Sequence, residues 1–255
     1  MNQMGVLDGK VAIVTGGSRG MGKSIALTYA EAGANVVIAS RTQKYIDRVA
    51  DKIKALGRES LAIATDVCIP EQVDNMVKQT VDYFGRLDIM INNAGRGIAT
   101  QPQEISIKEW NDIIALNLTG VFLGCIAAGK VMIEQKHGKI INIASTAGVK
   151  GSPGMIHYSV AKAGVIMLTN NLAASWAEHN INVNCIAPGL TATEGVKKWG
   201  ILPPDKNKDG TPVPRLLRPP VPKNIADLAL FLGSSASDHI TGELLIIRGH
   251  FPWDR

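Results

Sequence analysis

The chain has 255 residues, 45% hydrophobic and 19% charged, enough for a large core and few enough for one α/β domain. Its net charge of +5 raises nucleic acid as a partner, but the basic residues are scattered and only 5% of residues are aromatic, which argues against it and favours small anionic ligands. No apolar run approaches a membrane-spanning length and no signal-peptide pattern opens the chain, so we expect a cytoplasmic protein without a membrane segment. Three widely spaced cysteines in apolar surroundings predict reduced core thiols, with no metal site.

Short apolar runs rich in β-branched residues recur along the chain and predict seven strands. They cover residues 11–15, 35–39, 61–65, 87–91, 139–144, 181–187 and 243–247. Segments of helical period lie between them, at residues 22–31, 70–84, 110–134 and 158–178. Because the runs are continuously apolar rather than alternating, both faces of the sheet must be covered by helices. The expected fold is a doubly wound, Rossmann-like parallel sheet in a single domain over residues 1–255.

The stretch TGGSRGMGKS after the first predicted strand fits two kinds of phosphate-binding loop. Its later part matches the G-x-x-x-x-G-K-[ST] pattern of nucleotide triphosphatases, in which Lys23 would reach the phosphates. It also reads as a glycine-rich turn in which Gly16, Gly20 and Gly22 let the backbone approach a pyrophosphate at a helix N-terminus. The triphosphatase interpretation is supported only by Lys23 and Asp66, whereas the dinucleotide interpretation predicts features elsewhere in the chain.

Further motifs follow this loop in order: NNAG at residues 92–95, ALNLTG, NIASTAG, YSVAK, and APG with two threonines after it. In these motifs and in its TGxxxGxG loop, the chain resembles the short-chain dehydrogenase/reductase family over nearly its whole length. The resemblance implies an oxidoreductase that interconverts a ketone and a secondary alcohol by hydride transfer. It also implies four catalytic residues, which are Asn117, Ser145, Tyr158 and Lys162.

The resemblance assigns a role to each of these four residues. It implies that Ser145 polarises the substrate carbonyl, that Tyr158 delivers the proton, and that Lys162 binds the nicotinamide ribose while Asn117 holds a water of the proton relay. Independently, Tyr158 and Lys162 are four residues apart and share a helix face. We expect Lys162 to lower the pKa of Tyr158 by roughly three units, since an ammonium about 4 Å away contributes the required ~4 kcal/mol.

Adjacent helix residues point about 100° apart, so we expect His157, next to Tyr158, to lie at the pocket rim or surface.

The predicted cofactor site combines the glycine loop with the ends of several strands. Its residues are Gly16, Ser18, Arg19, Gly20, Met21, Gly22, Ser40, Arg41, Asp66, Val67, Asn93, Ala94, Gly95, Tyr158, Lys162, Pro188, Gly189, Thr191 and Thr193. An NAD site normally places an acid at the end of the second strand, but this chain has Ala-Ser-Arg there. Arg41 and Arg19 can fork around a 2′-phosphate, so we expect NADP(H) as the cofactor.

Other interpretations of these residues stay open. Arg41 can instead be an exposed residue at a helix start, and Asp66, which the resemblance places against the adenine, can instead cap the helix after Pro70. The protein can also be an NAD-preferring alcohol dehydrogenase, or a non-catalytic NADP sensor or scaffold of the same fold.

A segment rich in lysine and proline, at about residues 190–222, precedes the last helix and strand. Long irregular loops in compact domains are commonly lids or disordered, and we expect a lid over the substrate. The candidate substrate pocket is partly apolar with basic edges and comprises Arg96, Thr146, Lys150, Met155, Val196 and Trp199. An alcohol or ketone with an anionic portion fits it, and acyl thioesters, sugars, alicyclic alcohols and steroids all stay open as substrates.

The C-terminus departs from the family, which commonly has an aspartate and two glycines after its last strand. Here Arg248, Gly249 and His250 occupy that place, so the family's subunit geometry transfers less securely. Trp253 and Arg255 fit an interface and a loose tail equally well. In the family, the counterparts of the two long apolar helices pack between subunits, and the resemblance therefore implies a homodimer or homotetramer.

Overall fold

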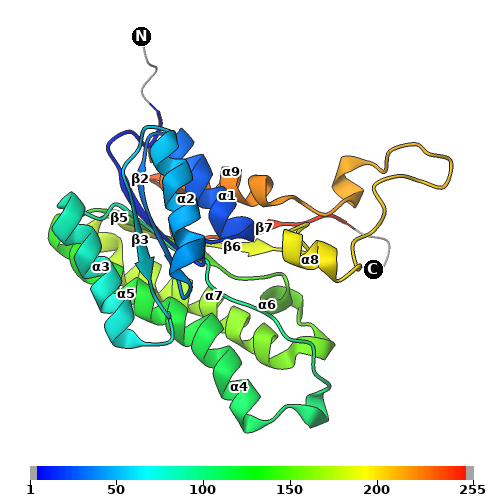
Figure 1. The fold of residues 1–255 in the computed structure, drawn as a ribbon. Helices are drawn as coiled ribbons and strands as arrows, with labels where there is room; N and C mark the ends of the chain where they lie inside the picture. Colours follow the sequence, from blue (N-terminus) through cyan, green and yellow to red (C-terminus); the bar gives the residue numbers. More distant parts are fainter. Residues whose placement is uncertain (1–4, 251–255) are drawn as a thin grey trace.

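The sheet has seven parallel strands in the order β3-β2-β1-β4-β5-β6-β7, in a computed structural model that describes residues 5–250 (Figure 1). The strands are β1 (Val11–Thr15), β2 (Asn35–Ser40), β3 (Ser60–Ala64), β4 (Ile89–Asn92), β5 (Gly138–Ile143), β6 (Ile181–Pro188) and β7 (Leu244–Ile247). All seven predicted strands are present, with ends that differ from the prediction by two residues at most. The predicted doubly wound, Rossmann-like fold in a single domain is confirmed.

Helices cover both faces of the sheet (Figure 1). One apolar cluster packs α1 (Gly20–Glu31), α2 (Gln43–Ala55) and α9 (Pro222–Gly233) on one face. A second cluster packs α3 (Pro70–Phe84), α5 (Gly120–Gln135) and α7 (Ile156–Trp176) on the other. Burial on both faces explains why the strand sequences are continuously apolar.

Two of the predicted helices differ in detail from the prediction. The helix expected over 110–134 begins earlier, as α4 (Ile107–Ile114), and passes through a π-helical turn (Ala115–Thr119) into α5. The helix expected over 158–178 begins at Ile156 and ends in a 3₁₀ turn (Ala177–His179). By length and composition, Ile107–Gln135 is apolar enough to cross a membrane, but half of its most apolar window is buried within the fold, as in a core helix.

The three cysteines are free thiols in this fold. Cys125 and Cys185 are buried, whereas Cys68 is half-buried after β3. Burial raises the pKa of Cys125 to about 12 and that of Cys185 to about 11, so both thiols stay protonated at neutral pH. The C-terminal residues Trp253 and Arg255 lie outside the described part of the chain.

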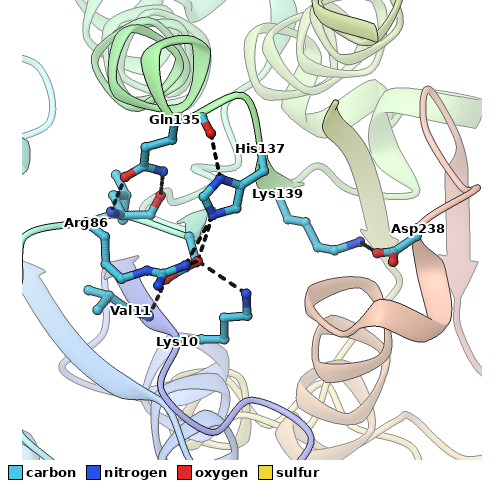
Figure 2. A network of polar contacts seen from close by, with 9 residues as sticks. Lys10, Val11, Arg86, Gln135, His137, Lys139 and Asp238 are labelled. Carbon is cyan, nitrogen blue, oxygen red and sulfur yellow. Dashed lines mark hydrogen bonds and ion pairs between the residues drawn. The ribbon is translucent and has the colours of Figure 1, made fainter. Parts of the chain in front are cut away.

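Figure 2 shows Lys10, Arg86 and His137 converging at the amino ends of several strands. The contacts centre on the buried carboxylate of Asp88. Asp88 accepts hydrogen bonds from the Val11 amide at 2.9 Å and from Arg86 Nε at 2.8 Å, and it contacts Lys10 and His137. Burial alone raises the pKa of Asp88, but the bonds from Arg86 and Val11 outweigh it and hold that pKa below its ordinary value. This network connects β1, β4 and β5 at the amino edge of the sheet, opposite the carboxyl edge.

Candidate active site and cofactor cleft

The glycine-rich loop runs from the carboxyl end of β1 into the first turn of α1. Gly16 and Gly20 have positive φ values of 64° and 55°, which L side chains rarely adopt. A Cβ on Gly22 would lie 2.5 Å from both the Gly16 carbonyl oxygen and Asn93 Nδ2, so no side chain fits there. The amino end of α1 can therefore approach a ligand closely, and its free amides and dipole favour an anion.

This loop forms one wall of a cleft of about 560 Å³ at the carboxyl edge of the sheet. The cleft lies where β1 has β2 on one side and β4 on the other, which is the switch point at which doubly wound folds bind ligands. Fourteen predicted cofactor residues line it: Gly16, Ser18, Arg19, Gly20, Met21, Gly22, Ser40, Arg41, Asp66, Val67, Asn93, Ala94, Gly95 and Thr193. The wall also includes residues that the motifs did not indicate, namely Thr65, Gly97, Leu116, Glu194, Gly195 and Lys198.

Two arginines lie at the end of the cleft formed by β2. Arg41 directly follows β2 and Arg19 directly precedes α1, and both side chains are exposed. Neither makes an ion pair with any residue that the structure describes, so both guanidinium groups are available to an anion. Arg41 is thus exposed near a helix start, as the alternative interpretation expected, and it also lines the cleft.

Asp66 lies in the wall of the cleft, whereas Lys23 lies outside it. The alternative interpretation of Asp66 as a helix cap is wrong, because the N-cap of α3 is Ile69. Asp66 instead shapes the turn after β3, where its carboxylate accepts a hydrogen bond from the Cys68 amide at 3.0 Å. Lys23 lies in the first turn of α1 but outside the residues that line the cleft, which disfavours the triphosphatase interpretation.

A second cavity of about 430 Å³ adjoins the cleft and is lined by Ser145 and Tyr158. All six predicted pocket residues line this cavity: Arg96, Thr146, Lys150, Met155, Val196 and Trp199. The predicted cofactor residues Pro188, Gly189 and Thr191 lie on its wall as well. Gly97, Ser152, Leu190, Arg248 and Gly249 also line the cavity, and they had no motif to indicate them.

Ser145 follows β5, and Tyr158 lies in the first turn of α7. Burial raises the pKa of the Tyr158 hydroxyl, and a hydrogen bond with Ser145 opposes that rise only in part. The expectation of a lowered Tyr158 pKa is therefore wrong for this structure. The physical reason is that the Lys162 side chain extends toward β5. Its Nζ donates to the Ile143 carbonyl at 2.7 Å and lies 5.8 Å from the centre of the Tyr158 ring.

Lys162 is buried beneath the cleft, with 3% of its surface exposed. Burial disfavours its charged form and lowers its pKa to about 8. A Cβ on Gly95 would lie 3.4 Å from Lys162 Nζ and 2.7 Å from Asn117 Oδ1, so the NNAG turn packs directly onto both residues. The fold thus places Lys162 and Asn117 directly beneath the NNAG turn, although the predicted cofactor residues Tyr158 and Lys162 do not themselves line the cleft.

Asn117 lies in the π-helical turn between α4 and α5 and is fully buried. Its Nδ2 donates to the carbonyls of Arg96 and Ile113 at 3.0 Å each, and its Oδ1 accepts from the Arg96 amide at 3.1 Å. The side chain therefore fixes the loop after β4, as a packing amide would. π-helical turns within α-helices are frequent at functional sites.

The expectation that His157 lies at the pocket rim or surface is wrong. His157 is fully buried, and its Nε2 lies 3.1 Å from Glu109 Oε1 of α4. The same carboxylate oxygen accepts a hydrogen bond from Thr100 Oγ1 at 2.6 Å. The rotation of about 100° between adjacent helix residues therefore points His157 at α4 rather than at solvent.

The segment that follows β6 crosses beside both cavities. A Cβ on Gly20 would lie 3.6 Å from Thr193 Cγ2, so Thr193 lies over the glycine loop. Thr193 also caps α8 (Glu194–Lys198) through a hydrogen bond from the Val196 amide at 3.2 Å. Val196 and Trp199 each line both the cleft and the Ser145–Tyr158 cavity, and Trp199 is 64% exposed.

The sheet and cleft define a Rossmann-like nucleotide-binding fold. Comparison with known proteins shows which family of this fold the chain belongs to. Residues 10–201 match the family model described as short chain dehydrogenase. The chain is 38% identical to 3-oxoacyl-[acyl-carrier-protein] reductase from Synechocystis over 96% of its own length and 98% of the relative's. It is 41% identical to a (2S)-[(R)-hydroxy(phenyl)methyl]succinyl-CoA dehydrogenase subunit from Thauera aromatica, over 95% and 96% of the two chains.

Solved structures agree with these relatives. A short-chain type dehydrogenase/reductase from Mycobacterium marinum superposes with a TM-score of 0.87 at 36% identity, over 96% of each chain. NAD⁺-bound xylitol dehydrogenase superposes with a TM-score of 0.88 at 29% identity, over 96% of this chain and 99% of the other. The protein belongs to the short-chain dehydrogenase/reductase family of oxidoreductases, which act on CH–OH and carbonyl groups.

Proposed function

We propose that the protein is an NADP(H)-dependent oxidoreductase that interconverts a ketone and a secondary alcohol on an acyl thioester. The observation that carries this proposal is that Ser145 and Tyr158 line one cavity, which adjoins the glycine-loop cleft. The names of two relatives, a 3-oxoacyl-[acyl-carrier-protein] reductase and a succinyl-CoA derivative dehydrogenase, support a thioester substrate.

The residues of the cleft fit a nicotinamide dinucleotide, since a Cβ would block the turn at Gly22 and the amino end of α1 favours pyrophosphate. When bound, this group supplies the hydride. The Ser145 hydroxyl holds and polarises the substrate carbonyl, and Tyr158 donates a proton to the forming alcohol oxygen. Because burial raises the pKa of Tyr158, its hydroxyl carries that proton at neutral pH, as reduction requires. Lys162, which packs beneath the NNAG turn, holds the ribose.

The proposed cofactor preference depends on Arg41 and Arg19. Replacing Arg41 with aspartate should weaken NADPH binding by about 1.5 to 3 kcal/mol and leave NADH binding nearly unchanged, because a charge-assisted hydrogen bond to the 2′-phosphate is lost. Titration of both cofactors against the parent and the variant measures this. Lys52→Asp is the matched control, because it makes the same charge change in the last turn of α2, outside the cleft. Equal affinity of the parent for NADPH and NADH would refute the NADP assignment.

The substrate class is tested by NADPH oxidation with a panel of ketones. We expect turnover of 3-oxoacyl thioesters and little turnover of sugars, steroids or alicyclic ketones. Tight NADPH binding without turnover across the panel would instead favour the non-catalytic sensor. Turnover confined to sugars or steroids would contradict the thioester assignment while leaving the oxidoreductase assignment intact.

We also propose that the protein assembles as a homodimer or homotetramer in the cytoplasm, each chain a single domain with residues 190–222 as a substrate lid. The helices α5 and α7 support the assembly, since they expose Phe122, Val160 and Met167 by 44%, 49% and 60%. Apolar groups that share a face are stabilised by a partner surface. Light scattering at micromolar concentration should give a dimer or tetramer mass, and Met167→Glu should lower it. A monomer mass for the parent would refute the assembly.

A further inference from the structure

A third cavity, of about 700 Å³, lies between the segment after β6 and the end of β7. Four cationic side chains line it: Lys197, Arg215, Arg218 and Arg248. Asp205 is the one acid among the described residues that line it, so the excess is three positive charges. Such a concentration of like charge is unfavourable without a counter-charge.

None of these four cations makes an ion pair with a residue that the structure describes. Arg218 is half-buried, and its Nε is fully shielded from solvent without a hydrogen-bond partner. A buried donor left unpaired is costly. Since Nε is shielded from the cavity, the four cations on the cavity wall, rather than this atom, indicate that an anion belongs there.

Arg248 connects this cavity to the active site, because it lines both the cationic cavity and the Ser145–Tyr158 cavity. The walls are held by the backbone, in which the Ala192 amide donates to the Pro220 carbonyl at 2.9 Å and the His250 amide donates to that of Leu216 at 2.8 Å. A long substrate with its carbonyl at Tyr158 would thus pass Arg248 before its far end reaches the cationic cavity.

We propose that the cationic cavity is a phosphate subsite that binds the pyrophosphate and 3′-phosphate of a coenzyme A thioester. The excess of three positive charges favours this multiply charged end over the single phosphodiester of a carrier-protein thioester. Arginine suits the site because its planar fork binds phosphate through paired hydrogen bonds. The proposal rests on the proposed function, since it concerns the far end of the substrate reduced at Tyr158.

The test compares two substrates that share the reacting group and differ in the phosphates: 3-oxobutanoyl-CoA and 3-oxobutanoyl-N-acetylcysteamine. Arg218→Gln and Arg215→Gln should each raise the KM for the CoA thioester by about ten- to a hundredfold, as expected for a lost charged hydrogen bond. The kcat/KM for the N-acetylcysteamine thioester should stay unchanged in both variants. Lys54→Gln is the control for the loss of a surface cation, because Lys54 is exposed in the last turn of α2, outside both the lid and the cavity, and it should change the kinetics with neither substrate.

Equal losses for both substrates, or no change for the CoA thioester, would overturn the subsite while leaving the proposed function in place. Preference of the parent for a carrier-protein thioester over the CoA thioester would also overturn it. If the parent reduces neither ketone, the proposed function fails, and calorimetry with coenzyme A alone then tests the subsite. Saturable binding of coenzyme A that weakens in Arg218→Gln would support the subsite. Coenzyme A binding of equal affinity in the parent and in both variants would overturn it.

Discussion

Replacing Tyr158 with phenylalanine should lower kcat by roughly 10²- to 10⁴-fold, the usual contribution of a positioned general acid. NADPH affinity should stay nearly unchanged, because only the hydroxyl is removed. The ring that packs against the loop after β4 is retained, where a Cβ on Gly97 would lie 3.6 Å from Tyr158 Cγ. Steady-state reduction of a 3-oxoacyl thioester and titration with NADPH measure the two effects separately.

Tyr83→Phe provides the control for the loss of a phenol hydroxyl. Tyr83 is 57% exposed on α3, and its hydroxyl contacts Glu59 far from the cleft. This variant should keep parental turnover. A kcat of Tyr158→Phe close to that of the parent would contradict the role of Tyr158 as proton donor.

Replacing Lys162 with methionine should damage both turnover and NADPH binding. Its Nζ lies beneath the NNAG turn, where we propose that it holds the ribose. Burial lowers the pKa of Lys162 to about 8, so the ammonium is present below that pH and is lost above it. The parent's kcat/KM, which reports the free enzyme, should therefore fall as pH rises through about 8, and the residual activity of Lys162→Met should lack that fall.

Lys23→Ala is the informative comparison, because Lys23 is the lysine that a nucleotide triphosphatase would require. It lies outside the cleft, and its loss should change neither NADPH binding nor turnover. ATP hydrolysis that disappears in Lys23→Ala would contradict the oxidoreductase account. Retention of full activity and NADPH affinity by Lys162→Met would contradict the role of Lys162.

The fold was predictable because its signals are local. Continuously apolar runs located the strands, and Pro70 with the helical period located α3 at its observed bounds. The glycine loop was predictable from its own TGxxxGxG pattern, although its close contacts with Asn93 are long-range in the sequence. The predicted cofactor and pocket residues line two adjoining cavities because parallel strands bring their carboxyl ends to one edge.

The wrong expectations for His157 and Tyr158 have a common physical cause. Sequence spacing predicts which face of a helix a residue lies on, but not which other element packs against that face. His157 was expected near solvent, but α4 covers that face of α7 and supplies Glu109. Tyr158 and Lys162 share a helix face, yet the lysine extends toward the Ile143 carbonyl of β5. The cationic cavity joins Arg215 and Arg218 to Arg248 through tertiary packing, which no sequence pattern indicated.

The most direct test of the account is isotope transfer from NADPH deuterated at C4 of the nicotinamide, with each C4 diastereomer used in turn. We predict that the parent transfers deuterium from one diastereomer to the carbinol carbon of the 3-hydroxyacyl thioester, as detected by mass spectrometry. Tyr158→Phe should bind the same cofactor and form labelled product about 10²- to 10⁴-fold more slowly. Saturable NADPH binding by the parent without deuterium in any product would contradict hydride transfer and would favour the sensor interpretation.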